Sequence, residues 1–117
     1  MASSLANITI DCADPEVLAE FWAAALGYVK QSAPEAGSDC TAVANPCGRR
    51  PRLLFRKVSE LKVVKNRVHL DLAAENMDAE VDRLVARGAR KLRTCHEQGR
   101  TWTMMTDPEG NEFCILG

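Results

Sequence analysis

The feature that most constrains the fold of this chain is an internal repeat. The segment Ile8-Thr9-Ile10-Asp11 has the same alternation of apolar and polar residues as Val68-His69-Leu70-Asp71, and Asp11 and Asp71 are 60 positions apart. Each segment is followed by a capped helix pattern and then by three strand patterns. Because self-similarity at a fixed spacing indicates a repeated structural unit, we predict two βαβββ modules, at about residues 5–58 and 66–117, within one domain of residues 1–117.

Each predicted module contains one amphipathic helix. Asp14 and Pro15 are typical of an N-cap and a first helical position, and Gly27 is a typical helix stop. Asn76 and Gly88 take the corresponding places in the second module. The apolar residues expected to face the sheets recur at helical spacing: Leu18, Phe21, Trp22, Ala25 and Leu26, then Met77, Val81, Leu84 and Val85.

The end of the chain reads as strand, tight turn and strand. Pro108 presets φ in the turn, and Gly110 can adopt the positive φ that the turn requires. In the last strand Phe113 and Ile115 share an apolar face, whereas Glu112 and Cys114 share a mixed face that can line a cavity. The other predicted strands are residues 5–12, 28–31, 41–44, 52–58, 68–71, 91–95 and 101–106, with a loop at 32–38 and a linker at 59–65.

Two four-stranded sheets, each with one helix on its outer face, make an α+β fold. We expect the polar faces of the two curved sheets to line a cleft between them. What that cleft holds decides the function.

Composition excludes several classes of function. The hydrophobic content of 46% and charged content of 26% are those of an ordinary globular protein. With 15 basic and 16 acidic residues and 5% aromatic residues, we expect no nucleic-acid partner. We find no signal peptide and no membrane segment, and five cysteines without C-x-x-C spacing indicate reduced thiols, so we expect no membrane partner and a cytoplasmic location.

The order and spacing of these motifs resemble the vicinal oxygen chelate superfamily, which includes glyoxalase I, bleomycin-resistance proteins and extradiol dioxygenases. The resemblance is nearest to small proteins with a glyoxalase-like domain, and it covers nearly the whole chain. It is carried by Asp14-Pro15, Phe21-Trp22 and Leu26-Gly27, then by Val68-His69-Leu70-Asp71-Leu72, Gly88 and Asp107-Pro108-Glu109-Gly110-Asn111-Glu112-Phe113.

The resemblance implies a place for a divalent metal, because catalytic members of the superfamily hold one with up to four His and Glu ligands. The corresponding positions are Asn7, Leu54 or Arg56, His69 and Cys114. Of these only His69 is a standard ligand, and His96 is expected in a turn outside the cleft. We therefore predict no cofactor and no stoichiometric metal: a divalent metal would find an incomplete ligand set, with His69 as its first ligand.

Three residues are candidates for catalysis. His69 can be a hydrogen-bonded pocket residue, a general acid or base, or a metal ligand. Cys114 can be a nucleophile beside His69 or a small residue at the floor of the cleft. Asp71 and its repeat equivalent Asp11 can perform acid–base chemistry together or cap turns.

Five residues are candidates for ligand binding. Trp102 can form an aromatic wall for a flat ligand or belong to the core, and Arg56 can hold an anionic group or lie on the surface. Asn7, Asp11 and Glu112 are the other polar residues expected at the cleft.

Three functions remain open. The first is a bleomycin-resistance-like protein that binds a small organic molecule without metal. The second is a lyase, isomerase or hydrolase that uses His69 with an acidic or thiol partner. The third is a metal enzyme of the glyoxalase I or dioxygenase type.

We predict that the protein is a homodimer, because members of the resembled superfamily commonly pair their modules and short sheets leave edges that need covering. Light scattering at micromolar concentration should give twice the chain mass of 12.8 kDa. A monomer mass would contradict this prediction.

Overall fold

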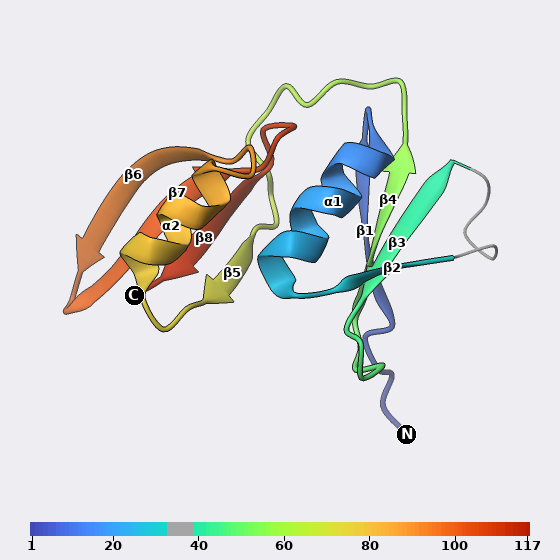
Figure 1. The fold of residues 1–117 in the computed structure, drawn as a ribbon, viewed down its shortest axis with the longest axis horizontal. Coiled ribbons are helices and arrows are strands. Elements are labelled where there is room, and N and C mark those ends of the chain that lie inside the picture. The colour runs from blue at the N-terminus through green and yellow to red at the C-terminus, as the bar shows by residue number, and fades with distance from the viewer. Residues whose placement is uncertain (33–38) are drawn as a thin grey trace. The chain divides into compact units, whose positions relative to one another are not determined.

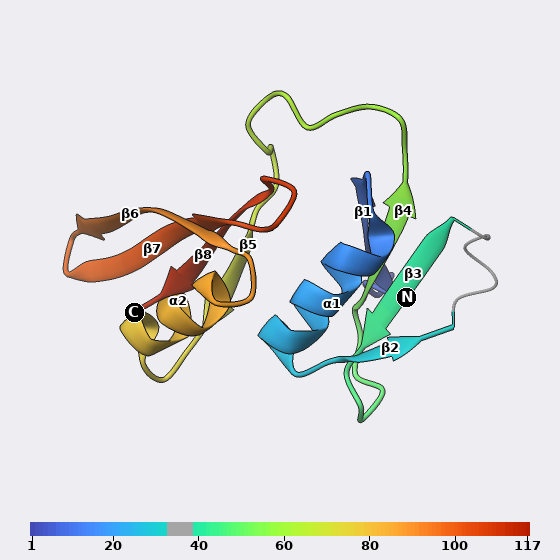
Figure 2. The ribbon, with the colours of Figure 1, turned by 45° about the horizontal axis from the view of Figure 1, so that its top comes forward.

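The computed structural model describes residues 1–32 and 39–117, which form two compact units, Met1–Leu61 and Lys62–Gly117 (Figures 1 and 2). The predicted loop at 32–38 therefore falls, apart from Ser32, outside the described residues. Each unit contains one helix and one four-stranded sheet, so the predicted α+β class and its two repeated modules are confirmed. In the described part of the chain, neither helix is long and apolar enough to span a bilayer.

The first unit has the strand order β1-β4-β3-β2, with β1 parallel to β4 and the other neighbours antiparallel. Helix α1 packs on one face of this sheet, against β2, β3 and β4 (Figure 1). The elements are β1 (Asn7–Cys12), α1 (Pro15–Leu26), β2 (Val29–Gln31), β3 (Cys40–Ala44) and β4 (Arg52–Lys57).

The second unit repeats this topology with the order β5-β8-β7-β6, and β5 is parallel to β8. Helix α2 packs against β6, β7 and β8 (Figure 2). The elements are β5 (Leu70–Ala73), α2 (Met77–Val85), β6 (Arg90–Glu97), β7 (Arg100–Thr106) and β8 (Glu112–Leu116).

Two of the strand boundaries that differ from the sequence prediction change the places of the histidines. Strand β5 begins at Leu70, so His69 lies just before it. Strand β6 continues to Glu97, so His96 lies in a strand and not in the predicted turn. The strands can run this far because Gln98 and Gly99, with φ of 50° and 76°, form a two-residue hairpin connection whose twist matches the strands.

The helix ends follow their predicted caps with one exception. The Asp14 side chain accepts hydrogen bonds from the first turn of α1, and Gly27 ends that helix in the left-handed region. Asn76 caps α2, but the helix ends at Val85, and the predicted stop, Gly88, lies in the following turn at φ 111°. At this φ a residue with a side chain would be strained, so the turn requires the glycine.

The two faces of the second sheet have different roles. On the face against α2, the residues Thr103, Met105, Phe113 and Ile115 are almost fully buried. The hydroxyl of Thr103 donates to Sδ of Met77 on α2, at 3.4 Å. Since successive side chains of a strand point to opposite faces, the alternate residues of β7 and β8 are left on the face away from the helix.

The turn between β7 and β8 is held by one buried carboxylate. Asp107 is 2% exposed, and its Oδ1 accepts hydrogen bonds from the backbone N–H of Glu109 at 2.9 Å and of Asn111 at 3.0 Å. The Asn111 side chain donates to Oδ2 at 3.0 Å, and Gly110 turns the chain at φ 88°. These contacts set the pairing of β7 with β8.

We expect Asp107→Ala to lower the free energy of unfolding by about 2–3 kcal/mol, because it removes the buried side-chain oxygens that accept hydrogen bonds from two partly buried N–H groups of the turn. Urea unfolding measures the loss. The matched control, Asp82→Ala on the exposed side of α2, should change stability by less than about 0.5 kcal/mol. Equal effects of the two variants would contradict this role for Asp107.

Candidate ligand-binding site

The face of the second sheet that points away from α2 carries the candidate site. Cys114 of β8 lies opposite Asp71 of β5 on one side and Met104 of β7 on the other. In the next row, Trp102 of β7 lies opposite Leu116 of β8. This pairing places a carboxylate, a thiol and several large apolar side chains on one surface.

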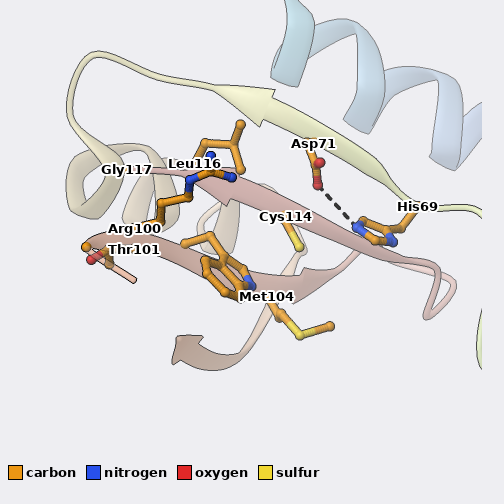
Figure 3. A pocket seen from close by; sticks show the side chains of 10 residues that line it. His69, Asp71, Arg100, Thr101, Met104, Cys114, Leu116 and Gly117 are labelled. Atoms are coloured by element: carbon orange, nitrogen blue, oxygen red, sulfur yellow. Dashed lines mark ion pairs between the residues drawn. The ribbon is translucent and has the colours of Figure 1, made fainter. Parts of the chain in front are cut away.

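These side chains line an open pocket of about 750 Å³ that is formed entirely within the second unit (Figure 3). Its size is in the range of small-molecule sites. The residues that line it come from the segment before β5, from β5, from β7 with the preceding turn, and from the end of the chain: His69, Asp71, Gly99, Arg100, Thr101, Trp102, Met104, Cys114, Leu116 and Gly117.

His69, Asp71 and Cys114 meet at one end of this pocket. Nε2 of His69 lies 3.2 Å from Oδ1 of Asp71, and the two side chains are 42% and 50% exposed. The ligand-type atoms of the three residues all lie within 4.8 Å of one another. Figure 3 shows the ion pair and the Cys114 sulfur beside it, whereas Arg100 and Leu116 lie away from this group. The three predicted catalytic candidates are therefore neighbours in space.

The environment of Cys114 keeps its thiol protonated. Burial raises the pKa of this thiol above its ordinary value, and Asp71 raises it further through its negative charge and by accepting a hydrogen bond from the thiol. Because the thiolate is the nucleophilic form, metal-free Cys114 is a weak nucleophile near neutral pH. The alternative interpretation, a small residue at the floor of the pocket, fits the 4% exposure of Cys114.

Trp102 lines the pocket. The sequence left two places open for this side chain, a wall of the cleft and the core. Two further lining residues, Arg100 and Met104, were not assigned a binding role from sequence. Arg100, Trp102 and Met104 alternate along β7. If the strand had been predicted to begin at residue 100 and not at 101, strand alternation would have placed Arg100 on the same face as Trp102 and Met104.

Glu112 is not among the residues that line this pocket. Its Oε2 accepts the backbone N–H of Asn66 at 2.9 Å, and its own N–H donates to Oδ1 of Asn66 at 2.8 Å. Nζ of Lys62 lies 3.4 Å from Oε1. These contacts tie the segment before β5 to the start of β8, so Glu112 supports the position of the residues that lead to His69.

The other ligand-binding candidates, Asn7, Asp11 and Arg56, lie in the first unit. Oδ1 of Asn7 accepts a hydrogen bond from Nε of Arg52 at 3.0 Å, and both residues line a smaller pocket of about 380 Å³. Asp11 Oδ1 accepts from Nε and Nη2 of Arg56 at 3.2 and 3.1 Å. Leu54, beside them in β4, is buried and has no ligand atom. The first-unit positions implied by the resemblance therefore do not fit a metal.

Comparison with known proteins identifies the family. Residues 7–116 match the family described as the glyoxalase-like domain. A comparison with curated proteins finds no match.

Solved structures share the fold at low sequence identity. A glyoxalase/bleomycin resistance protein/dioxygenase family enzyme from Burkholderia phytofirmans has a TM-score of 0.77 and 17% identity, covering 97% of this chain and 98% of that chain. The fosfomycin resistance protein FosX from Listeria monocytogenes has a TM-score of 0.77 and 16% identity, with coverages of 99% and 93%. The hypothetical protein SA1046 from S. aureus has a TM-score of 0.77 and 19% identity, with coverages of 99% and 94%. At these identities the likeness establishes the fold alone.

The Glu112 contacts predict a pH dependence of stability. Partial burial alone would raise the pKa of Glu112, but the N–H groups of Asn66 and Glu112 and the Lys62 cation outweigh it, and the pKa is lowered from its ordinary value of 4.5. A carboxyl with a lowered folded-state pKa contributes stability above about pH 4.5, and this contribution is lost as the pH falls through the folded-state pKa. We expect Glu112→Gln to cost on the order of 1 kcal/mol at pH 7, and this cost should shrink toward pH 3.

Urea midpoints of the wild type and of Glu112→Gln, taken from pH 7 to pH 3, measure this cost. Glu75→Gln, at an exposed position, is the matched control. A cost that is constant over the whole pH range would contradict the prediction.

Proposed function

Because this chain belongs to the glyoxalase-like domain family, we propose that it binds a small, flat organic molecule with an anionic group in the pocket of the second unit. The observation that carries this proposal is the arrangement of an indole, a thioether and a guanidinium around one pocket of suitable size. Binding of this kind needs no chemical step, so sequestration of the ligand is sufficient as a function.

The apolar part of the pocket favours a flat ligand. Trp102, Met104 and Leu116 occupy adjacent positions on β7 and β8. An aromatic ring and a thioether are polarizable surfaces on which a planar molecule can stack. The opposite face of the sheet is packed on α2, so the backbone that carries these side chains is held in place. This lowers the entropic cost of ordering the site when a ligand binds.

The charged part of the pocket favours an anion. Arg100 lines the pocket two positions before Trp102 on the same strand. A guanidinium matches a carboxylate or phosphate in geometry and charge. A planar molecule on Trp102 can therefore place an anionic substituent at Arg100.

A second function, enzymatic catalysis, is favoured by one observation. Nε2 of His69 lies 3.2 Å from Oδ1 of Asp71, at the opposite end of the pocket from Arg100. A carboxylate that orients an imidazole is the arrangement of a general base. On this alternative the bound molecule is a substrate for a lyase or isomerase, with His69 abstracting a proton. Turnover that is lost in His69→Gln while binding is kept would select catalysis over sequestration.

The binding proposal is tested with a panel of aromatic carboxylates and their matched neutral amides. We expect carboxylates to bind more tightly than the amides and to quench the fluorescence of Trp102. Trp102→Phe should abolish the quenching but keep binding by calorimetry, because the other tryptophan, Trp22, is 2% exposed in the core of the first unit. Arg100→Gln should weaken carboxylate binding by about tenfold, the equivalent of one charged hydrogen bond.

Arg87→Gln is the matched control, because Arg87 is exposed and does not line the pocket. Equal affinity for carboxylates and amides, or equal losses in the two arginine variants, would reject the anionic ligand. The absence of binding by the whole panel would reject the proposal.

A further inference from the structure

We propose that a second copy of this chain pairs with the outer edge of β6, in an antiparallel register with its twofold axis at Cys95. The inference does not rest on the organic-ligand function. It goes beyond the expectation of a homodimer, because it assigns the surface at which the two copies meet and the residues that face each other there.

Strand β6 lies at the edge of the second sheet and, among the described strands, is paired with β7 alone (Figure 1). Its eight residues make it longer than the other edge strands of the two sheets, β1, β2 and β5, which have six, three and four. Arg93, His96 and Glu97 are exposed, and Thr94 and Cys95 are half-buried. An edge strand of this kind offers backbone N–H and C=O groups to which another chain can add a strand.

The hairpin turn at Gln98 and Gly99 determines which of these backbone groups are available. The residues that flank a two-residue hairpin turn form a hydrogen-bonded pair, and such pairs alternate along antiparallel strands. Glu97, which lies opposite Arg100, and every second residue before it therefore direct their backbone groups to β7. The backbone groups of the residues between them, Thr94 and His96, point away from the sheet. A second strand must bond to these two residues.

Charge complementarity selects one register for a twofold pair. The outward-pointing residues can meet as Thr94 with Thr94, Thr94 with His96, or His96 with His96. Only the register that pairs Thr94 with His96 places Arg93 of one copy opposite Glu97 of the other, and the symmetry forms this pair twice. Within residues 1–32 and 39–117 neither charge has an ion-pair partner. Opposite charges that face each other across two strands stabilise their pairing.

A β-bulge limits the length of the interface. The register of β6 with β7 shifts between Lys91 and Arg93, and a bulge bends its strand and interrupts the ladder. Continued pairing beyond the bulge would place Arg90 of one copy opposite Arg100 of the other, which is unfavourable because the charges are alike. The bulge keeps this pair apart and leaves residues 93–97 as the pairing segment. Because a twofold pair uses each edge once, the assembly closes at two copies.

The two Cys95 residues face each other across the proposed axis. They form a non-hydrogen-bonded pair, in which the Cα atoms of opposite residues lie about 4.5 Å apart. A disulfide requires a Cα separation of about 4.4–6.8 Å, so the register brings the two thiols within reach of each other. Formation of a Cys95–Cys95 disulfide by an added oxidant is therefore a test of the register.

The proposed pairing joins two four-stranded sheets into one sheet of eight strands. Cys95 lies opposite Trp102 of β7, and Arg93 lies opposite Met104. Both residues of β6 are therefore on the face that carries the candidate pocket. Since the twofold axis of an antiparallel strand pair is perpendicular to the sheet, the pockets of the two copies open on the same face.

The side-chain contacts are tested by sedimentation of the full chain over a range of micromolar concentrations. Arg93→Glu and Glu97→Arg each place like charges opposite each other twice, and each should raise the Kd of the dimer by at least about tenfold. The double variant Arg93→Glu/Glu97→Arg restores two pairs of opposite charge and should return the Kd to that of the wild type. Arg87→Glu, at an exposed position outside β6, is the matched control and should leave the Kd unchanged.

The backbone contacts are tested with His96→Pro. Proline removes the N–H that points away from the sheet and leaves the hydrogen bonds with β7 in place, because edge strands accept proline in this orientation. We expect this variant to be a folded monomer, with folding verified by circular dichroism. The control His96→Gln keeps the backbone N–H and should remain a dimer.

The register is tested by oxidation of Cys47→Ser, which lacks the exposed cysteine of the first unit. Diamide accepts one hydrogen from each of two thiols and is reduced to the hydrazine, while the two sulfurs form a disulfide. We expect a cross-linked dimer of twice 12.8 kDa on a non-reducing gel. The double variant Cys47→Ser/Cys95→Ser should give no such dimer.

A wild type that is a monomer throughout the micromolar range would overturn the proposal. A dimer that is unaffected by Arg93→Glu and His96→Pro would also overturn it, because its interface would then lie on another surface. Failure of the charge exchange to restore the Kd, or cross-linking that persists without Cys95, would reject the register. Binding of aromatic carboxylates is measured separately, so the two proposals can fail independently.

Discussion

The buried carboxylate of Asp107 sets the geometry on which the candidate site depends. It accepts hydrogen bonds from the turn that joins β7 to β8, and so determines which residues of the two strands face each other. A slip of one residue in that pairing would move every side chain of β8 to the opposite face of the sheet. Cys114 would then point into the core and Phe113 into the pocket.

The two units show how one topology can carry different chemistry. In each, the first strand is paired in parallel with the last, and an aspartate lies at the same place in the register. In the first unit the partner is an arginine, and the charges of the carboxylate and guanidinium compensate each other. In the second unit the partner is a cysteine, whose neutral thiol leaves the Asp71 carboxylate available to His69. At this place in the register, the chemical difference between the repeats is the residue type opposite one carboxylate.

Periodicity and caps were sufficient to predict most of the fold. Asp14, Gly27 and Asn76 have local hydrogen-bonding and backbone requirements that can be recognised from sequence, and the repeat defines the topology. Gly88 was predicted to end α2, but it lies in the turn that follows the helix. The sequence does not distinguish a glycine that ends a helix from one that belongs to a later turn. In the site, His69, Asp71, Cys114 and Trp102 were found as pocket residues. Glu112 was predicted to bind a ligand, but it is held by Asn66, 46 positions earlier in the chain. Strand alternation predicts the face on which Glu112 lies, but it does not predict a hydrogen-bond partner such as Asn66, which lies outside the strands.

The alternation of buried and open positions along β7 and β8 has an evolutionary consequence. Thr103, Met105, Phe113 and Ile115 preserve the packing on α2, while the residues between them face the pocket. Mutations at the intervening positions are thus largely decoupled from folding and can accumulate without loss of the scaffold. Relatives that diverge at those positions can acquire new ligands while retaining the same backbone.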